Sequence, residues 1–453
     1  MTTAAKVRNP SEHSKNLSRV IESGASLRAR IQGEQVPRGT IKLSGAKNAA
    51  TRLMAAAMLT DDTVVLNGFP TELVDANHKA RFMRASGVCV EMDSENDSVT
   101  IRADNLKTAE FDMDDGMFPI RTTYLLVPGQ IRKTGRARIP YPGGCKIGAR
   151  GYDLHVKIWE CLGCSVEEKL GHIEVIGNGF KAGQINFPIS TVGGTENALM
   201  CASIADGMTE IVNAYITPEI DDLIKLLNRM GAEIEVFGNS MIRVNGREKL
   251  SGTHMPVMAD RIEALTWIIY ALMSGGEIRI DNVPFHAMEI PLIHIEKSGV
   301  DLLTSSQAIY VHPDCILAGS VQPFELSCGT HPGIISDMQP FYVLLGLIAN
   351  GTSRIFDYRY PERIACVHEL AKLCGADNID AQAGKITTRG TTVFKGAHVN
   401  STDLRGSMAV ILAGLCAQGE TIVEDAHMAL RGYNNLTEKL AQLGVLMEIE
   451  QAL

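Results

Sequence analysis

One pattern occurs six times along this chain: the end of an amphipathic helix, then a glycine, then a strand. Segments such as MRASGVCVEM, LNRMGAEIEV and AQLGVLMEI show it clearly. A repeat constrains the fold strongly, because each unit must bury its apolar face against its neighbours. Glycine is expected after such a helix, since the residue there often takes a positive φ that only glycine adopts without steric cost. The six glycines, about 70 residues apart, are Gly87, Gly163, Gly231, Gly299, Gly375 and Gly444.

Each unit begins with an apolar helix that follows a small or acidic residue, and a turn and a β-branched strand come next. Residues 191–212, 260–280, 336–356 and 402–423 show this half of the unit. Asp or Thr directly before an apolar run is the usual N-cap. The sequence therefore predicts an α/β fold built from a helix–strand–helix–strand–strand unit. Because the helices are apolar nearly all round and the strands on one face only, we expect helices inside and sheets outside.

Six units divide into two groups of three, so we expect two domains. Repeat counting alone places a boundary near residues 255–260. We assign residues 47–258 to one domain and residues 29–46 plus 259–453 to the other. Residues 1–28 are polar and precede the first unit, and we expect them to form a flexible extension.

The charge balance excludes several classes of partner. The chain has 453 residues, with 43 Lys and Arg against 52 Asp and Glu, a net charge of −9. This charge does not favour nucleic acid or an anionic membrane surface. The longest apolar runs, 265–273 and 409–417, fall far short of the roughly 18 residues of a spanning helix. The polar N-terminal stretch has no apolar core of a secretory signal, so we expect a cytoplasmic protein. Most of the ten cysteines lie in apolar settings typical of buried, reduced thiols, among them Cys89, Cys201, Cys315, Cys366 and Cys416.

Polar and charged residues gather where the first helix of a unit begins, in five of the six units. Converging helix N-termini offer unpaired N–H groups and partial positive charge, so they form a site for phosphate or carboxylate. Asp403 and Thr195 are equally well explained as caps. Cations oppose the helix dipole, so an anionic ligand explains Lys47, Arg121 and Arg405 better. The five groups are Lys47-Asn48, Arg121, Thr195-Glu196-Asn197, Asp337, and Asp403 with Arg405.

The segment 142–150 places one cysteine, Cys145, on a glycine-rich loop. Cations such as Lys146 and Arg150 lower the pKa of a nearby thiol, so Cys145 is a candidate reactive residue; an accidental loop cysteine is the alternative. The histidine and cysteine spacings match no metal motif. Neither 44–47 nor 148–150 has the glycine spacing of a nucleotide-binding loop. We therefore expect no metal and no cofactor.

Several motifs stand in order between about residue 29 and the C-terminus. They are SGAKNAA at 44–50, the loop at 142–150, SDMQ at 336–339, TDLR at 402–405 and RGY at 431–433. Together they resemble the UDP-N-acetylglucosamine enolpyruvyl transferase family, whose relatives, the enolpyruvylshikimate phosphate synthases, lack the PGGC loop. The resemblance implies an inside-out α/β barrel of two domains with three units each. It also implies transfer of the enolpyruvyl group of phosphoenolpyruvate to the sugar 3′-hydroxyl with release of phosphate, the first committed step of peptidoglycan synthesis.

The same resemblance implies roles for particular residues. Cys145 matches the family's general acid and covalent cysteine, and Asp337 matches the carboxylate beside the attacking hydroxyl; the addition needs both an acid and a base. Phosphoenolpyruvate carries two anionic groups, each of which arginine can bind in a bidentate way. Asp403 is a further candidate for substrate binding. The matching positions put Lys47, Arg150 and Arg431 at the phosphate, Arg363 and Arg405 at the carboxylate, Arg121 and Asn48 at the nucleotide sugar, and Gly151, Tyr152, Asp153, Leu154, Thr191 and Val192 beside the uridine diphosphate.

The sequence departs from the family pattern at four places. None of them removes a group that the chemistry needs, but they alter the walls of the nucleotide pocket. Two alternatives therefore stay open: an enolpyruvyl transferase acting on another uridine nucleotide such as UMP in nucleoside-antibiotic synthesis, and a catalytically silent nucleotide-sugar binding protein. The presence of Cys145, Asp337 and the cations argues against the silent protein. The departures are Gly151-Tyr152 for Pro-Val, Ile334-Ile335-Ser336 for Phe-Pro-Thr, Glu362-Arg363-Ile364 for Asn-Arg-Phe, and Leu430 for an acid.

Overall fold

The computed structural model describes residues 26–108, 120–143 and 151–451. Within them the predicted order of helix, strand, helix and two strands recurs in the first five units, whereas the sixth has a single strand after its second helix. The six glycines that mark the units all have positive φ, from 74° at Gly444 to 107° at Gly231. This confirms the prediction that each glycine ends a helix in a conformation that other residues rarely adopt.

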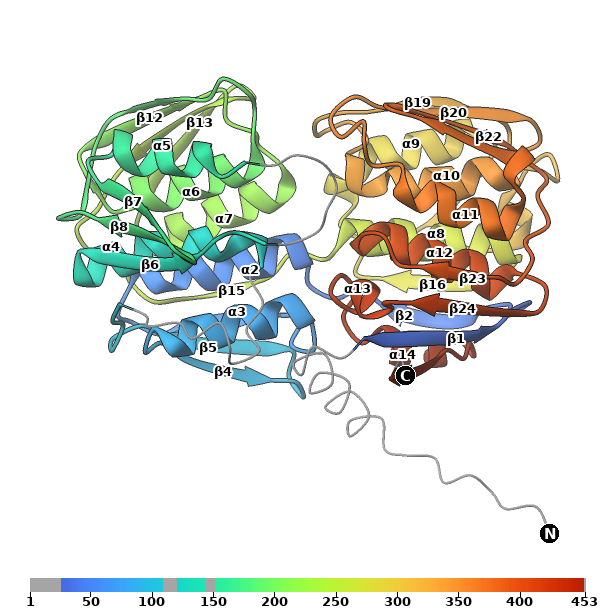
Figure 1. The fold of residues 1–453 in the computed structure, drawn as a ribbon, viewed down its shortest axis with the longest axis horizontal. Coiled ribbons are helices and arrows are strands. Elements are labelled where there is room, and N and C mark those ends of the chain that lie inside the picture. Colours follow the sequence, from blue (N-terminus) through green and yellow to red (C-terminus); the bar gives the residue numbers. More distant parts are fainter. Residues whose placement is uncertain (1–25, 109–119, 144–150, 452–453) are drawn as a thin grey trace, which may run out of the picture.

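The first three units form the lobe on the left of Figure 1, called the first lobe below. Unit one contains α2 (Lys47–Ala56), η1 (Ala57–Leu59), β3 (Val64–Asn67), α3 (Val74–Ala85), β4 (Cys89–Asp93) and β5 (Ser98–Arg102). Unit two contains η2 (Arg121–Leu126), α4 (Val127–Thr134), β6 (Arg136–Pro140), α5 (Asp153–Cys161), β7 (Ser165–Lys169) and β8 (His172–Ile176). Unit three contains β9 (Phe180–Lys181), β10 (Gln184–Asn186), α6 (Val192–Ser203), β11 (Ala205–Asp206), β12 (Met208–Val212), α7 (Pro218–Arg229), β13 (Glu233–Phe237) and β14 (Met241–Asn245), and β15 (Thr253–Pro256) follows it.

The other three units and the two N-terminal strands, β1 (Leu27–Gln32) and β2 (Arg38–Lys42), form the second lobe, on the right of Figure 1. Unit four contains α8 (Arg261–Ser274), β16 (Glu277–Asp281), η3 (Phe285–Ala287), α9 (Glu289–Lys297), β17 (Leu303–Thr304), β18 (Ala308–Val311) and η4 (Pro313–Cys315). Unit five contains β19 (Glu325–Cys328), η5 (Ser336–Met338), α10 (Gln339–Ile348), β20 (Thr352–Asp357), α11 (Ala365–Cys374), η6 (Ala376–Asn378), β21 (Ile379–Gln382) and β22 (Lys385–Arg389). Unit six contains β23 (His398–Asn400), α12 (Leu404–Cys416), β24 (Glu420–Glu424), α13 (His427–Leu430), α14 (Leu436–Gln442) and β25 (Glu448–Gln451).

The sheets share one strand order. In the four-stranded sheets the first strand of the unit pairs in parallel with a strand from a neighbouring segment, as β15 does with β3 and β19 with β20. On its other side it pairs antiparallel with a strand of its own unit, as β3 does with β5. In unit six this position is filled from the chain start, because β1 lies between β24 and β25, with Ala29 opposite Val423 and Ile449. The N-terminal strands therefore belong to the sheets of the second lobe.

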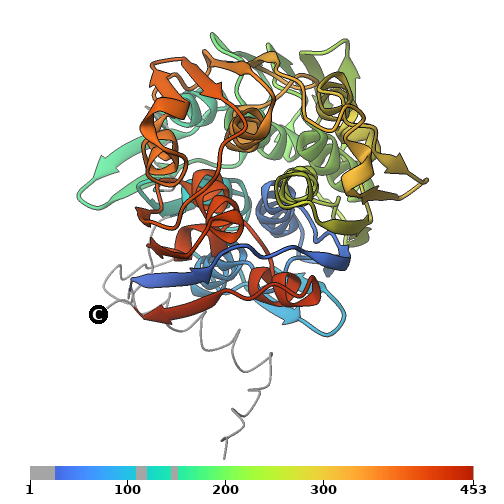
Figure 2. The same ribbon diagram turned by 90° about the vertical axis from the view of Figure 1, so that its right-hand side faces the viewer.

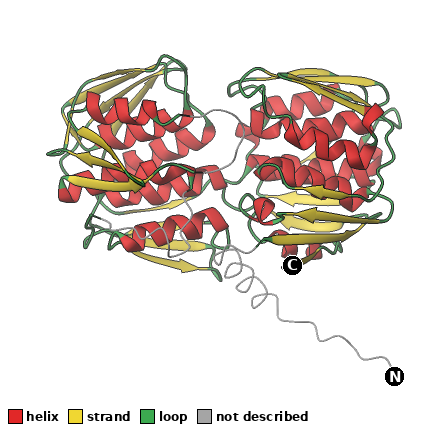
Figure 3. Ribbon diagram, in the orientation of Figure 1, coloured by secondary structure: helices red, strands yellow, loops and turns green. Residues whose placement is uncertain are grey.

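Helices occupy the interior of each lobe and sheets lie on its outside (Figures 2 and 3). In α8 every residue from 261 to 272 is buried, and in α12 every residue from 404 to 415. The strands instead alternate, as in β3, whose burial follows a period of two. Residues that are apolar all round a helix can be buried only if other elements surround it, which agrees with this layering.

Each lobe has its own hydrophobic core. One core uses residues between 46 and 257, and the other uses residues 29–43 together with residues between 259 and 445. The chain crosses between the lobes twice, where Gly45 and Ala259 form an isolated bridge. A Cβ at Gly45 would lie 2.3 Å from the backbone oxygen of Gly68, so the close approach of the first crossing to the turn after β3 requires glycine there.

The cysteine prediction is right for three of the five named thiols. Cys201, Cys315 and Cys366 are buried, and Cys416 is half-buried. Cys89 is exposed, because it occupies an outward position in the alternating pattern of β4, so the prediction of burial was wrong there. In the part of the chain that the structure describes, no helix is long and apolar enough to cross a membrane.

Candidate active site between the lobes

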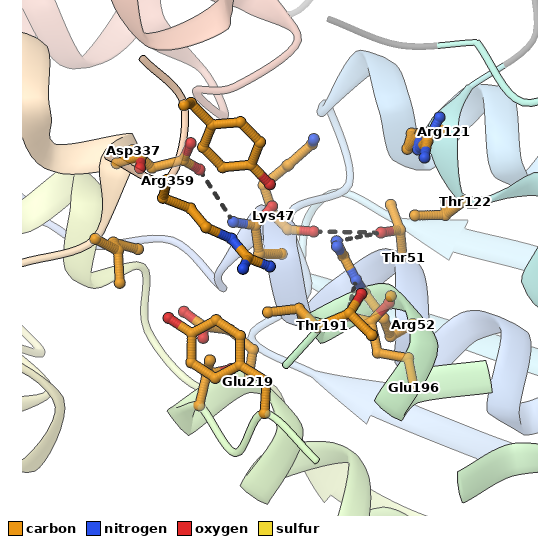
Figure 4. Close-up of a pocket in the computed structure, with 18 of the residues that line it drawn as sticks. Lys47, Thr51, Arg52, Arg121, Thr122, Thr191, Glu196, Glu219, Asp337 and Arg359 are labelled. Atoms are coloured by element: carbon orange, nitrogen blue, oxygen red, sulfur yellow. Dashed lines mark hydrogen bonds and ion pairs between the residues drawn. The ribbon is translucent and has the colours of Figure 1, made fainter. Parts of the chain in front are cut away.

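A cavity of about 530 Å³ lies between the two lobes and is lined by residues of both (Figure 4). The starts of α2, η2, α6, η5 and α12 all contribute to it, so the structure brings together the five helix starts that the sequence singled out. The third of these groups contributes only Glu196; Thr195 and Asn197 instead bond to the backbone N–H of Tyr215 and to Trp159. The convergence of helix starts is the feature that defines the site.

Most of the predicted site residues line this cavity. Tyr152 does not, since its hydroxyl bonds to Glu168 3.0 Å away and its ring lies against Tyr141. Cys145 and Arg150 lie outside the described residues. The predicted residues in the lining are Lys47, Asn48, Arg121, Gly151, Asp153, Leu154, Thr191, Val192, Asp337, Arg363, Asp403, Arg405 and Arg431.

Asp75, at the start of α3, joins two of the expected phosphate-binding cations. One of its oxygens lies 2.8 Å from Nε of Arg431 and the other 3.2 Å from Nζ of Lys47, so the carboxylate links the two lobes. Burial would raise the pKa of Asp75, but the charges of Arg431 and Lys47 outweigh burial and hold that pKa well below its ordinary value. The three groups together carry one positive charge.

Asp337 is held by a second cluster of the cavity lining. Nη1 of Arg363 lies 2.9 Å from Oδ1 of Asp337, and Nη2 of Arg363 lies 2.6 Å from Oδ1 of Asp403. Asn48, from the first lobe, donates to the other oxygen of Asp337 at 3.4 Å. Burial would raise the pKa of Asp337, but Arg363, Arg405 and Lys47 outweigh it, so this carboxyl stays ionised well below its ordinary pKa.

Arg405 lies close enough to this cluster for its charge to lower the pKa of Asp337. Its NH2 is 3.6 Å from Asp260, and its guanidinium stacks over the ring of Tyr433 at 5.0 Å. Asp403 caps α12 by accepting from the backbone N–H groups of Arg405 and Gly406. Asp403 is therefore both the N-cap of α12, one of the two interpretations that the sequence left open, and an ion-pair partner of Arg363.

The internal carboxylates correct one part of the sequence argument. An anionic ligand was expected to explain the cations at helix starts, yet Lys47 and Arg405 already face Asp75 and Asp260. These ion pairs offset the unfavourable helix dipole before any ligand binds. Nε of Arg363 and of Arg405 have no hydrogen-bonding partner among the described residues, so these guanidinium groups still have unused donors.

The start of α8 adds a site group that the sequence analysis missed. Arg261 is 1% exposed and forms a bidentate pair with Glu219 of α7, with N–O distances of 2.9 and 3.2 Å. Asp260 caps the same helix. The signal was available, because the sequence analysis interpreted the acidic residue before α8 only as an N-cap and left this unit out of the five with polar groups that point to a ligand site. Applying the helix-start rule to all six units would have found Asp260 and Arg261.

Other lining residues that were not among the predicted site residues carry weaker sequence signals. His155 stacks on Tyr124 with ring centroids 3.6 Å apart, and burial together with the charge of Arg121 lowers the pKa of His155 to about 3. It is therefore a neutral packing group. Arg52, one turn into α2, pairs with buried Glu196 at 2.7 Å. Asp75 opens the second helix of its unit, a position the sequence analysis did not consider.

Comparisons with a family model and with curated proteins point to the same family. A model for the family described as EPSP synthase (3-phosphoshikimate 1-carboxyvinyltransferase) matches residues 31–440. UDP-N-acetylglucosamine 1-carboxyvinyltransferase of Beijerinckia indica is 35% identical over 430 residues, covering 93% of this chain and 98% of the relative. The Koribacter versatilis protein of the same name is 35% identical over 416 residues, covering 91% and 94%.

Two solved structures have a similar fold. The enolpyruvyl transferase NikO from Streptomyces tendae superposes with a TM-score of 0.84 at 23% identity, covering 95% of this chain and all of the other. An EPSP synthase from Acinetobacter baumannii gives 0.69 at 18% identity, covering 94% and 100%. At these identities the two structures support the mixed α/β fold alone.

Proposed function

Because the chain belongs to the EPSP synthase family of enolpyruvyl transferases, we propose that it transfers the enolpyruvyl group of phosphoenolpyruvate to the 3′-hydroxyl of UDP-N-acetylglucosamine and releases phosphate. The reaction is then the first committed step of peptidoglycan synthesis. One observation carries the proposal: an ionised carboxylate, Asp337, lies in the same cavity as cations from both lobes. Such a cavity suits a small substrate with two anionic groups beside a hydroxyl that must lose a proton.

In the proposed reaction, residues of both lobes bind the substrate. Lys47 and Arg431, with Arg150, bind the phosphate, and Arg363 and Arg405 bind the carboxylate of phosphoenolpyruvate. Asp337 accepts the hydroxyl proton as the hydroxyl oxygen bonds to C2, and Cys145 donates a proton to C3. The Cys145 thiolate then takes a proton back from C3 as the bond between C2 and the phosphate oxygen breaks, which restores the double bond and releases phosphate.

The acceptor is bound, in this proposal, on the side of the cavity formed by Arg121, Asn48 and the start of α6. Arg121 donates to the backbone oxygen of Gly151 at 2.7 Å, which ties η2 to the segment 151–154. We also propose that the two lobes are the domains 47–258 and 29–46 plus 259–453, each an inside-out α/β barrel. Their separate cores support that division.

Phosphate release tests the proposed acceptor. Purified protein is incubated with phosphoenolpyruvate and, separately, UDP-N-acetylglucosamine, UMP or shikimate 3-phosphate. We expect release with UDP-N-acetylglucosamine alone. Release with UMP alone would replace this acceptor by another uridine nucleotide, and release with shikimate 3-phosphate alone would move the protein to the shikimate reaction. If folded protein releases no phosphate with any of the three, the transfer reaction is contradicted for these acceptors.

Replacing Cys145 by Ser is expected to lower kcat by a factor of about 10²–10⁴, because a hydroxyl is a far weaker general acid than a thiol. Phosphate release under saturating substrates measures the effect. Cys161→Ser, at an exposed thiol outside the cavity, is the matched control and is expected to keep the wild-type rate. A wild-type rate for Cys145→Ser would remove this cysteine from the mechanism.

A further inference from the structure

Arg359 enters the cavity from the second lobe, just after β20. Its loop is anchored by Asp357, a buried carboxylate that accepts hydrogen bonds from the backbone N–H groups of Arg359 and Tyr360 at 3.1 and 3.0 Å. Asp357 is itself fixed by Ser336 and Gln339, at 3.0 and 3.3 Å. The loop therefore holds the Arg359 backbone in place, and its side chain extends toward the cavity (Figure 4).

The guanidinium of Arg359 reaches across to the first lobe. Its NH2 donates to the backbone oxygen of Ser190 at 2.6 Å, directly before Thr191, which caps α6. Thr191, Val192 and Gly193 also line the cavity. Arg359 is thus placed beside the start of α6, on the side of the cavity assigned above to the acceptor.

Arg359 differs in charge balance from other cations of the cavity. Lys47 and Arg431 face Asp75, Arg363 faces Asp337, and Arg261 faces Glu219. Within residues 26–108, 120–143 and 151–451, Arg359 has a neutral carbonyl as its side-chain partner and no carboxylate within ion-pair distance. Its positive charge is therefore not offset by the described part of the protein.

From this placement we propose that Arg359 is a specificity-determining residue that binds a phosphoryl group of the acceptor nucleotide. The inference rests on the proposed function and extends it to a residue from the opposite lobe. A planar guanidinium is suited to phosphate oxygens, because its donors form a fork that two oxygens can accept at once. Ser190 occupies one donor and leaves the others for the ligand.

The test compares a phosphorylated and an unphosphorylated ligand in the whole chain. Calorimetry measures the Kd of UDP, and ligand-detected NMR measures uridine binding, for wild type, Arg359→Gln and Arg359→Lys. Loss of one charge-assisted bond predicts an approximately 10- to 100-fold weaker Kd for UDP in Arg359→Gln. Uridine binding is expected to be unchanged, and Arg359→Lys to recover part of the affinity for UDP. In turnover assays the KM of the acceptor should rise while that of phosphoenolpyruvate stays constant.

Arg354→Gln is the matched control, since Arg354 lies on β20 of the same unit and pairs with Glu325 away from the cavity. It is expected to bind UDP as wild type does. Equal UDP affinity in wild type and Arg359→Gln would overturn the inference, as would equal losses for UDP and uridine, which indicate a structural latch between the lobes. Absence of UDP binding by the wild type would also overturn it. These binding measurements need no turnover, so they still test the role of Arg359 if the transfer assay shows no reaction.

Discussion

Replacing Asp337 by Asn is expected to lower kcat by a factor of about 10²–10⁴ while the protein stays folded, because the variant removes the base and keeps the shape. The structure supports this role, since the carboxylate lies in the cavity lining and contacts groups of both lobes, Arg363 and Asn48. The side chain is 29% exposed, which leaves room for a hydroxyl to approach it. Phosphate release under saturating substrates measures kcat, and circular dichroism checks the fold.

The pH dependence gives an independent check on Asp337. Its pKa is depressed by Arg363, Arg405 and Lys47, so the base form persists below the ordinary range of an aspartate near 3.9. Protonation of Asp337 therefore removes no activity above about pH 5, and the acid side of the wild-type rate profile must arise from another group.

The control for the Asp337→Asn measurement of kcat is Asp314→Asn, which changes an exposed carboxylate in the second lobe. A wild-type kcat for Asp337→Asn would exclude this residue as the base.

Replacing Glu219 by Gln is expected to lower the free energy of unfolding by about 3–5 kcal/mol. The change leaves the guanidinium of Arg261 buried between the lobes without its carboxylate, and a buried unpaired charge is costly. Both N–O contacts of the pair are within 3.2 Å, and the side chains of Arg261 and Glu219 are only 1% and 7% exposed, so the charge of Arg261 loses a close and largely buried partner. Urea denaturation followed by fluorescence measures the change in unfolding free energy.

Two further variants separate this effect from ordinary loss of a contact. Arg243→Met breaks the Arg243–Glu210 pair, whose side chains are 43% and 27% exposed, and is expected to cost less than about 1 kcal/mol. The double variant Glu219→Leu with Arg261→Met removes both charges and is expected to recover most of the lost stability. A Glu219→Gln protein as stable as the wild type would mean that Arg261 is satisfied by other groups.

Most of what could be predicted about the fold came from the sequence repeat. The spacing of the helix-ending glycines identified six units and the order of elements within them, because a helix end and its positive φ leave a local signature. The burial of individual side chains was predicted less accurately. Cys89 sits among apolar residues in the sequence, yet the pleat of β4 turns it outward, since alternation along a strand depends on register.

The helix-start rule also located most of the candidate site. It predicted that Lys47, Asn48, Arg121, Asp337 and Arg405 share a cavity, which the structure shows. The rule could not reveal internal partners. Asp75 is far in sequence from Arg431, and their 2.8 Å contact arises only when the lobes meet. From the sequence alone an anionic ligand was the expected partner of these cations, although several of them are already paired with carboxylates of the protein.

By itself, the sequence determined which residues start helices, which glycines end them and which side chains can carry the chemistry, because these properties depend on neighbours a few positions away. Only the tertiary structure decided which charges offset one another across the gap between the lobes. Coulomb energies and desolvation depend on distance and burial in space, and two residues 356 positions apart, such as Asp75 and Arg431, acquire both only when the chain is folded. The same reason explains why Arg359 drew no notice in the sequence and stands out in the structure.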